Sequence, residues 1–174
     1  MSAEHDGRRR GPRSPRAVEP KPADIYGKAL GLLARREHSV RELKQKLAIR
    51  GHAAAEAGAA IGRLTQQSYQ SDERFAASLA RKRAAQGYGP QRIHAELKSH
   101  GLSDPAVRAA LASLDIDWVA SAAAQLRRHA GSRAPADHAE RGKRAQFLLR
   151  RGFDAATVRA VTRAEMDDPT PNLD

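Results

Sequence analysis

Apolar residues recur every three or four positions in short segments along most of this chain. In residues 39–51, Leu43 and Leu47 lie at the spacing of one helix face. The segment begins with a serine and carries Glu42 three positions later, which is the pattern of a capping box with two reciprocally bonded amides. It ends at Gly51, and glycine readily takes the left-handed conformation that terminates many helices. The pattern therefore predicts one helix with a defined start and end.

The same pattern is repeated twice further along the chain. At an offset of 50 residues, Leu43, Leu47 and Gly51 correspond to Ile93, Leu97 and Gly101. At an offset of 51 residues, Leu97, Gly101 and Val107 correspond to Leu148, Gly152 and Val158. A period of about 50 residues indicates an array of supersecondary units that contact mainly their neighbours. Each unit has room for three helices, so we expect about nine helices.

Composition favours an all-α fold in which the units depend on one another. Aromatic residues make up 4% of the chain, 35 of the 174 residues are alanine, and few segments alternate with period two. A core of alanine and a few leucines buries little area, so a single unit is marginal alone. We therefore predict three tandem three-helix repeats stacked into an elongated, curved array. The expected parts are a disordered basic arm at 1–22, repeats at 23–66, 67–116 and 117–164, and an acidic tail at 165–174.

Helix starts are marked by short polar residues and by proline. Asp24, Asp72, Asp104 and Asp154 each precede a predicted helix and are expected N-caps. Pro90 follows a Gly-Tyr-Gly break and suits the first turn of the next helix.

The chain is strongly basic, with a net charge of +11. The predicted helical body, residues 23–164, holds 25 basic and 13 acidic residues, a balance of +12, so the charge is not confined to the arm. Such an excess indicates an anionic partner, which could be nucleic acid, an acidic protein surface or anionic lipid, although it could also serve solubility alone. Most cations fall on the first two helices of each repeat. The alanine-rich third helices are poor readers of base edges, so we expect salt-sensitive contacts with phosphate or an acidic groove.

No catalytic pattern is recognisable. The sequence has no cysteine, no HxxxH or HExxH pair and no phosphate-binding GxxxxGK[ST] loop. We therefore expect a protein that is not an enzyme and holds no metal or cofactor. The absence of cysteine fits a cytoplasmic location, and no apolar run approaches the roughly 20 residues of a membrane span. Aromatic residues are isolated along the chain, which argues against a ladder for stacking bases, and Phe75 and Phe147 are expected in the core.

Four stretches together resemble the RecX family, the bacterial regulators of the RecA recombinase. They are residues 34–43, residues 69–76, residues 87–101 around Gly-Tyr-Gly-Pro, and residues 147–153, and they span about 25–163 in the family's order. The family usually has glycine before the aromatic residue at Tyr69, where this chain has Ser68. The resemblance implies three tandem three-helix units that bind along the groove of the RecA–single-stranded DNA filament. It also implies inhibition of strand exchange, ATP hydrolysis and co-protease activity, with DNA binding by some members.

The basic clusters outside the apolar stripes are the predicted contacts with the filament. They are Arg35, Arg36, Lys44, Arg81, Lys82, Arg83, Arg127, Arg128, Arg150 and Arg151. The expected partner is the RecA nucleoprotein filament, with single- or double-stranded DNA as a further partner, and the chain is expected to be a monomer. Two other functions stay open at this point, a non-sequence-specific nucleic-acid-coating protein and a repressor with sequence preference. The sequence does not decide whether the chain caps the filament or lies in its groove, or whether it inhibits or stimulates RecA. It also does not indicate what the basic arm and the acidic tail do.

Overall fold

The computed structural model describes residues 22–131 and 133–167, and within them the chain forms nine α-helices and no strand. The helices are α1 (Pro22–Leu33), α2 (Val40–Ile49), α3 (Ala54–Gln66), α4 (Asp72–Ala85), α5 (Pro90–Ser99), α6 (Asp104–Ala112), α7 (Trp118–Ala130), α8 (His138–Arg150) and α9 (Ala155–Asp167). The all-α prediction is confirmed. The predicted basic arm lies outside the described residues except for its last position, and so does most of the acidic tail.

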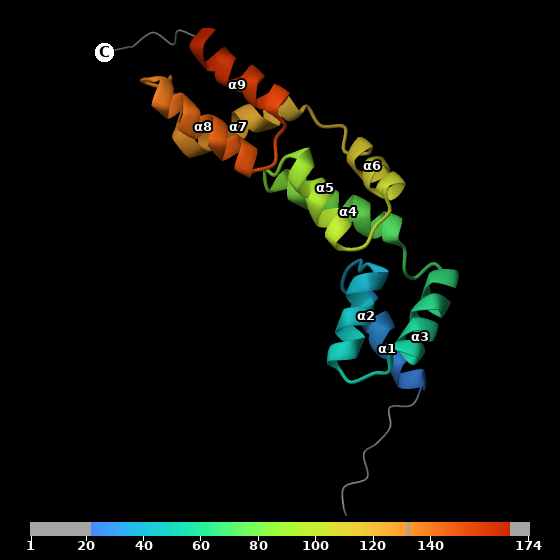
Figure 1. The fold of residues 1–174 in the computed structure, drawn as a ribbon. Coiled ribbons are helices and arrows are strands. Elements are labelled where there is room, and N and C mark those ends of the chain that lie inside the picture. The colour runs from blue at the N-terminus through green and yellow to red at the C-terminus, as the bar shows by residue number, and fades with distance from the viewer. Residues whose placement is uncertain (1–21, 132, 168–174) are drawn as a thin grey trace, which may run out of the picture.

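The helices pack as three bundles of three, arranged end to end in an elongated body (Figure 1). Helices α1–α3 form repeat 1, α4–α6 form repeat 2 and α7–α9 form repeat 3. Each repeat has its own core, built around Leu43 and Leu47, around Ile93 and Leu97, and around Leu148 with its neighbours. The periodic residues of the sequence therefore do form the buried faces, as predicted.

The recurring glycines and the first serine cap behave largely as the sequence predicts. Gly51, Gly101 and Gly152 have φ angles of 81°, 83° and 87°, in the left-handed region that favours glycine. The hydroxyl of Ser39 accepts a hydrogen bond from the Glu42 amide at 3.1 Å. The carboxylate of Glu42, however, bonds to Arg36 rather than back to the serine amide, so only half of the predicted capping box is formed.

Three of the four predicted aspartate caps are wrong. Asp154 does cap α9, because its carboxylate accepts from the Thr157 amide at 2.9 Å. Helix α1 already begins at Pro22, so Asp24 lies inside it. Helices α4 and α6 are capped by Ser71 and Ser103, the serines directly before the two aspartates. A serine hydroxyl in the extended Ncap position reaches the amide three residues on, which leaves the following aspartate free for other contacts.

Repeats 2 and 3 are joined through their backbones. The Gly89 amide donates to the Arg151 carbonyl at 2.9 Å, and the Gln91 amide donates to the Gly152 carbonyl at 3.0 Å. This approach requires glycine, since a Cβ on Gly89 would lie 2.4 Å from backbone atoms of Gly152. Trp118 packs against the cores of both repeats. The junction therefore combines backbone hydrogen bonds with shared apolar packing.

Repeats 1 and 2 meet through polar side chains. Asp72 accepts hydrogen bonds from the Val40 amide at 3.0 Å and from the Gln70 side chain at 2.8 Å. Arg74 of repeat 2 donates to Glu37 at 2.7 Å. Among the described residues, the two cores have no member in common. The aspartate that the sequence assigns to a helix cap instead ties the first repeat to the second.

Candidate partner-binding surface

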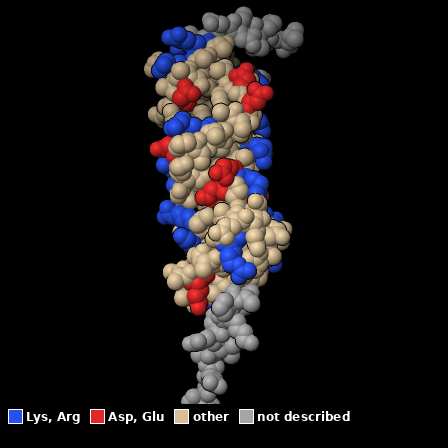
Figure 2. Space-filling model, turned by 90° about the vertical axis from the view of Figure 1, so that its right-hand side faces the viewer, with Lys and Arg blue, Asp and Glu red and all other residues tan. Residues whose placement is uncertain are grey.

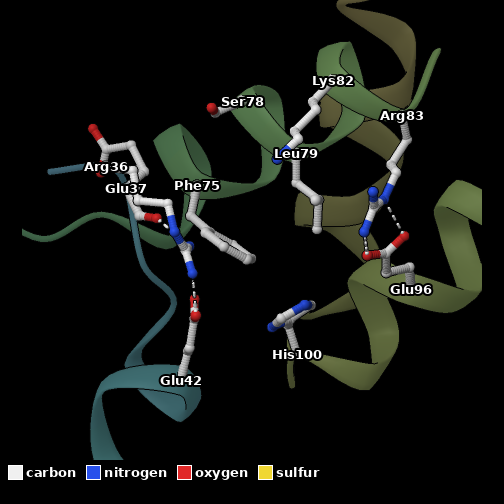
Figure 3. Close-up of a pocket in the computed structure, with 10 residues that line it drawn as sticks. All are labelled: Arg36, Glu37, Glu42, Phe75, Ser78, Leu79, Lys82, Arg83, Glu96 and His100. Carbon is white, nitrogen blue, oxygen red and sulfur yellow. Dashed lines mark hydrogen bonds and ion pairs between the residues drawn. The ribbon is translucent and has the colours of Figure 1, made fainter. Parts of the chain in front are cut away.

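Three of the ten predicted contact residues line a cleft between repeats 1 and 2. Arg36 enters it from repeat 1, and Lys82 and Arg83 enter it from helix α4 (Figure 3). The cleft has a volume of about 260 Å³, and Phe75 and His100 form an edge-to-face pair beside it, with ring centroids 4.8 Å apart. Phe75 is 4% exposed, so its predicted core position is confirmed.

Two of these three cations are held by carboxylates of the chain itself. Arg36 donates to Glu42 at 3.0 Å, and Arg83 donates through Nε to Glu96 at 2.7 Å. The bond from Arg83 is the main cause that lowers the pKa of Glu96 below its usual value, although burial opposes it. Paired in this way, Arg36 and Arg83 have less charge to offer an outside anion than the exposed Lys82 beside them.

A second hollow, with a volume of about 480 Å³, lies at the same junction. Lys44 and Arg41 line it from helix α2, together with Asp72 and His100. Both cations are exposed, and neither forms an ion pair with a carboxylate in the described part of the chain. Arg41 was not among the residues predicted from sequence, although its position two residues after the Ser39 cap places it on the solvent side of α2.

The remaining predicted residues belong to repeats 1, 2 and 3 as separate groups. Arg35 and Arg81 are exposed near the ends of α1 and α4. Arg127 and Arg128 are exposed in the last turn of α7. Arg150 is exposed as well, but Arg151 is half-buried because its guanidinium reaches across to repeat 2, where Nη1 donates to the Gln86 carbonyl at 3.0 Å. The ten residues are thus distributed along the body rather than gathered at one point.

The side of the molecule formed by the third helices differs from this pattern. Figure 2 shows the side on which α3, α6 and α9 lie in Figure 1. Uncharged residues cover most of this side, and many Lys and Arg lie at its margins. The exposed cations of the third helices are Arg63, Arg108, Arg159 and Arg163. The prediction that cations concentrate on the first two helices of each repeat agrees with this view.

The sequence missed two features of the charged surface. Arg144 is 4% exposed and donates to Glu140 at 2.8 Å, so it is part of repeat 3 rather than of its surface. The sequence also carried no sign that the Tyr88 and Phe147 rings both contact the Arg151 guanidinium. These rings lie 59 positions apart in the chain, and no local pattern indicates that both contact the same guanidinium.

Other kinds of site find no support in residues 22–131 and 133–167. No group of three or more His, Cys, Asp or Glu in this part of the chain could hold a metal ion. No helix there is long and apolar enough to cross a bilayer. The arrangement of the described side chains is that of a binding surface with exposed cations.

Comparison with known proteins identifies the family. Family models described as the first, second and third three-helix domains of RecX match residues 26–64, 71–111 and 115–162. The regulatory protein RecX of Xanthomonas citri is 48% identical over 141 residues, which cover 81% of this chain and 87% of that protein. The chain belongs to the RecX family. The regulatory protein RecX of Stenotrophomonas maltophilia (strain R551-3) is 45% identical and covers 93% of this chain and 94% of its own.

A solved RecX structure shares the fold. The crystal structure of RecX from Lactobacillus salivarius superposes with a TM-score of 0.73 at 20% identity, covering 84% of this chain and 97% of that one. The three RecX domain matches coincide with the three bundles, so the elements that carry the cations belong to the family architecture. Ser68, where the family resemblance leads one to expect glycine, has a φ of 60° and so occupies the conformation that favours glycine.

Proposed function

We propose that this RecX-family chain binds the RecA–single-stranded DNA filament and inhibits the recombinase, ATPase and co-protease activities of RecA. It acts in the cytoplasm, as a monomer, and can contact DNA through its basic surface. Family membership supports the regulatory role. The observation that carries the mechanism is the elongated body with exposed cations in all three repeats, which suits a long, polyanionic partner better than a compact ligand.

Among the ten predicted residues, most of the proposed contact is carried by those that are exposed and form no ion pair with a carboxylate of the described chain. These are Arg35, Lys44, Arg81, Lys82, Arg127, Arg128 and Arg150. Arg36 and Arg83 would first have to leave their carboxylate partners, which costs part of any gain from a new anion. We assign those two mainly to the shape of the cleft between repeats 1 and 2, and Arg151 to the junction of repeats 2 and 3.

The test is a titration of the single-stranded-DNA-dependent ATPase of RecA with this chain. We expect inhibition at ratios well below one chain per RecA, because a regulator acts on filament segments rather than on single subunits. The double variant Arg127→Glu, Arg128→Glu should weaken inhibition, and it should do so more strongly at low salt. A matched control is Arg159→Glu, Arg163→Glu on helix α9, which changes the net charge equally within the same repeat.

Three results would contradict the proposal. Equal loss of inhibition in both double variants would mean that net charge, and not the surface of the first two helices, drives binding. A chain that coats naked single strands as tightly as RecA-covered ones, without lowering ATPase activity, would instead support the alternative of a non-sequence-specific nucleic-acid-binding protein. A footprint on selected but not on random duplex would support a repressor.

A further inference from the structure

Five side chains from repeats 2 and 3 form a chain of cation–π and ring-stacking contacts across their junction. The Arg92 guanidinium lies 4.5 Å from the centre of the Tyr88 ring, and that of Arg151 lies 5.5 Å from the same ring. Arg151 also lies 5.2 Å from the centre of Phe147, and His129 stacks on Phe147 with centroids 3.8 Å apart and planes 2° from parallel. We call these five residues the arginine–aromatic cluster.

Within the described residues, the cations of this cluster form no ion pair. Neither Arg92 nor Arg151, nor the adjacent Arg150, forms an ion pair with a carboxylate of the described chain. Arg151 Nη1 donates to the Gln86 carbonyl at 3.0 Å, and Arg92 Nη1 approaches the Arg150 carbonyl at 3.4 Å. Glu96 lies close enough to Arg92 for that charge to help lower the Glu96 pKa, but its carboxylate is bonded to Arg83. Three like charges at one junction, none of them in an ion pair within the described chain, favour the arrival of an anion.

Stacking leaves the arginines able to bind that anion. A guanidinium that lies over a ring uses its flat face, while its N–H groups point outward in its plane. Phosphate accepts hydrogen bonds from such N–H groups in a paired geometry. A rotatable lysine ammonium in the same place could supply charge but not the planar stack.

The end of the cluster provides a flat ring in contact with solvent. His129 is exposed, although it is stacked on Phe147. It follows Arg127 and Arg128 in the last turn of α7, and both of these cations are exposed. An ordered ring beside unpaired cations is the combination that proteins use for single-stranded nucleic acids, in which bases stack and phosphates pair with arginine.

We propose that the arginine–aromatic cluster is a binding site for single-stranded nucleic acid. One base stacks on His129, and the phosphates on either side pair with Arg127, Arg128 and the arginines of the junction. Bases inside a duplex are already stacked on each other, so this site favours a single strand over a duplex of the same sequence. The site is assembled only when repeats 2 and 3 are docked, since Tyr88 and Arg92 come from one repeat and the other three residues from the next. The proposed site depends on the proposed function in one respect only, namely that the bound single strand is the DNA of the RecA filament.

Fluorescence anisotropy with a fluorescein-labelled oligothymidylate tests the site in the absence of RecA. His129→Ala should weaken binding by roughly 5- to 100-fold, the range expected when one base–aromatic stack is removed. His129→Phe keeps a flat ring and should retain most of the affinity. His94→Ala, a matched change of an exposed histidine on helix α5, should bind like the parent chain. Far-ultraviolet circular dichroism of each variant shows whether it is folded.

Three outcomes would overturn the site. They are unchanged affinity in a folded His129→Ala variant, equal affinity for duplex and single strand, and equal losses in His129→Ala and His94→Ala. If such an outcome is found while the parent chain still inhibits RecA ATPase, the nucleic-acid site is wrong and the proposed function stands. If the parent chain does not inhibit RecA ATPase but binds single strands tightly and through His129, the proposed function is wrong and the nucleic-acid site stands.

Discussion

Replacing Gly89 with alanine should separate repeats 2 and 3 while leaving each repeat intact. Gly89 has a φ of −80°, so alanine fits its backbone conformation without strain. The new Cβ, however, would lie 2.4 Å from the carbonyl carbon and oxygen of Gly152 and from the Phe153 nitrogen. All three are backbone atoms, which cannot move aside as a flexible side chain can. The two chain segments must therefore move apart.

The cost follows from what that movement breaks. The Gly89 and Gln91 amides donate across the junction at 2.9 and 3.0 Å, and each such bond contributes about 1 kcal/mol. Overpacking of a well-filled contact typically costs a further 1–3 kcal/mol or so. We expect a loss of about 3–5 kcal/mol in the free energy of unfolding. With a urea dependence of about 2 kcal/mol per molar, in the middle of the usual range, the midpoint should fall by roughly 1.5–2.5 M.

Urea unfolding followed by two signals measures this loss. Circular dichroism reports all helices, whereas the fluorescence of Trp118, the only tryptophan, reports the junction because its ring packs on both cores. The control is Gly62→Ala on the exposed side of α3, where a Cβ meets nothing within 4 Å. That change should raise stability by up to about 1 kcal/mol, since alanine favours helix. A Gly89→Ala chain with the parent's midpoint would refute the description of this junction.

Four further substitutions test other parts of the fold by urea unfolding. Ser68 and Gly51 both have a positive φ, which favours glycine. Ser68→Gly should therefore stabilise the chain by up to about 1 kcal/mol, and Gly51→Ala should destabilise it by a similar amount. A destabilising effect of Ser68→Gly would contradict this reasoning. Asp72→Ala leaves the Val40 amide without its partner and should cost about 1–3 kcal/mol, unless water replaces the carboxylate. Burial alone would raise the pKa of Glu42, but hydrogen bonds from Arg36 and His38 outweigh it and lower the pKa below 4.5. Glu42 therefore stabilises the fold above pH 4.5, and the advantage of the parent over Glu42→Gln should shrink as pH falls through the lowered value, whereas a constant difference would contradict this sign.

Local signals in the sequence were sufficient for the repeat architecture. Leucines at helical spacing and a glycine after each second helix depend on contacts within one helix and its cap, so a period of about 50 residues could be detected without coordinates. The N-caps were less predictable, because Ser71 and Asp72, or Ser103 and Asp104, are both good caps side by side. Which of two adjacent residues takes the extended Ncap conformation depends on the path of the preceding loop.

The charged surface was predicted only in outline. Sequence shows which helices carry cations, but not which cations meet a carboxylate. Arg83 donates a hydrogen bond to Glu96, which lies thirteen positions away on another helix. Arg151 meets Tyr88 across a repeat boundary. The first pair depends on how α4 and α5 pack within repeat 2, and the second on how repeats 2 and 3 are docked. Alanine-rich helices encode neither arrangement in any short pattern.

The contacts at the two junctions determine how firmly the cations of each repeat are held in place for binding a partner. Backbone hydrogen bonds, Trp118 and the arginine–aromatic cluster hold repeats 2 and 3, and none of these contacts is an ion pair that salt would screen. Repeat 1 is held by Asp72 and by the partly exposed Arg74–Glu37 pair, and exposed pairs of this kind are weak and salt-sensitive. Repeats 2 and 3 therefore present their cations as one body with a fixed geometry, whereas the position of Lys44 on repeat 1 depends on polar contacts that an anionic partner can compete for.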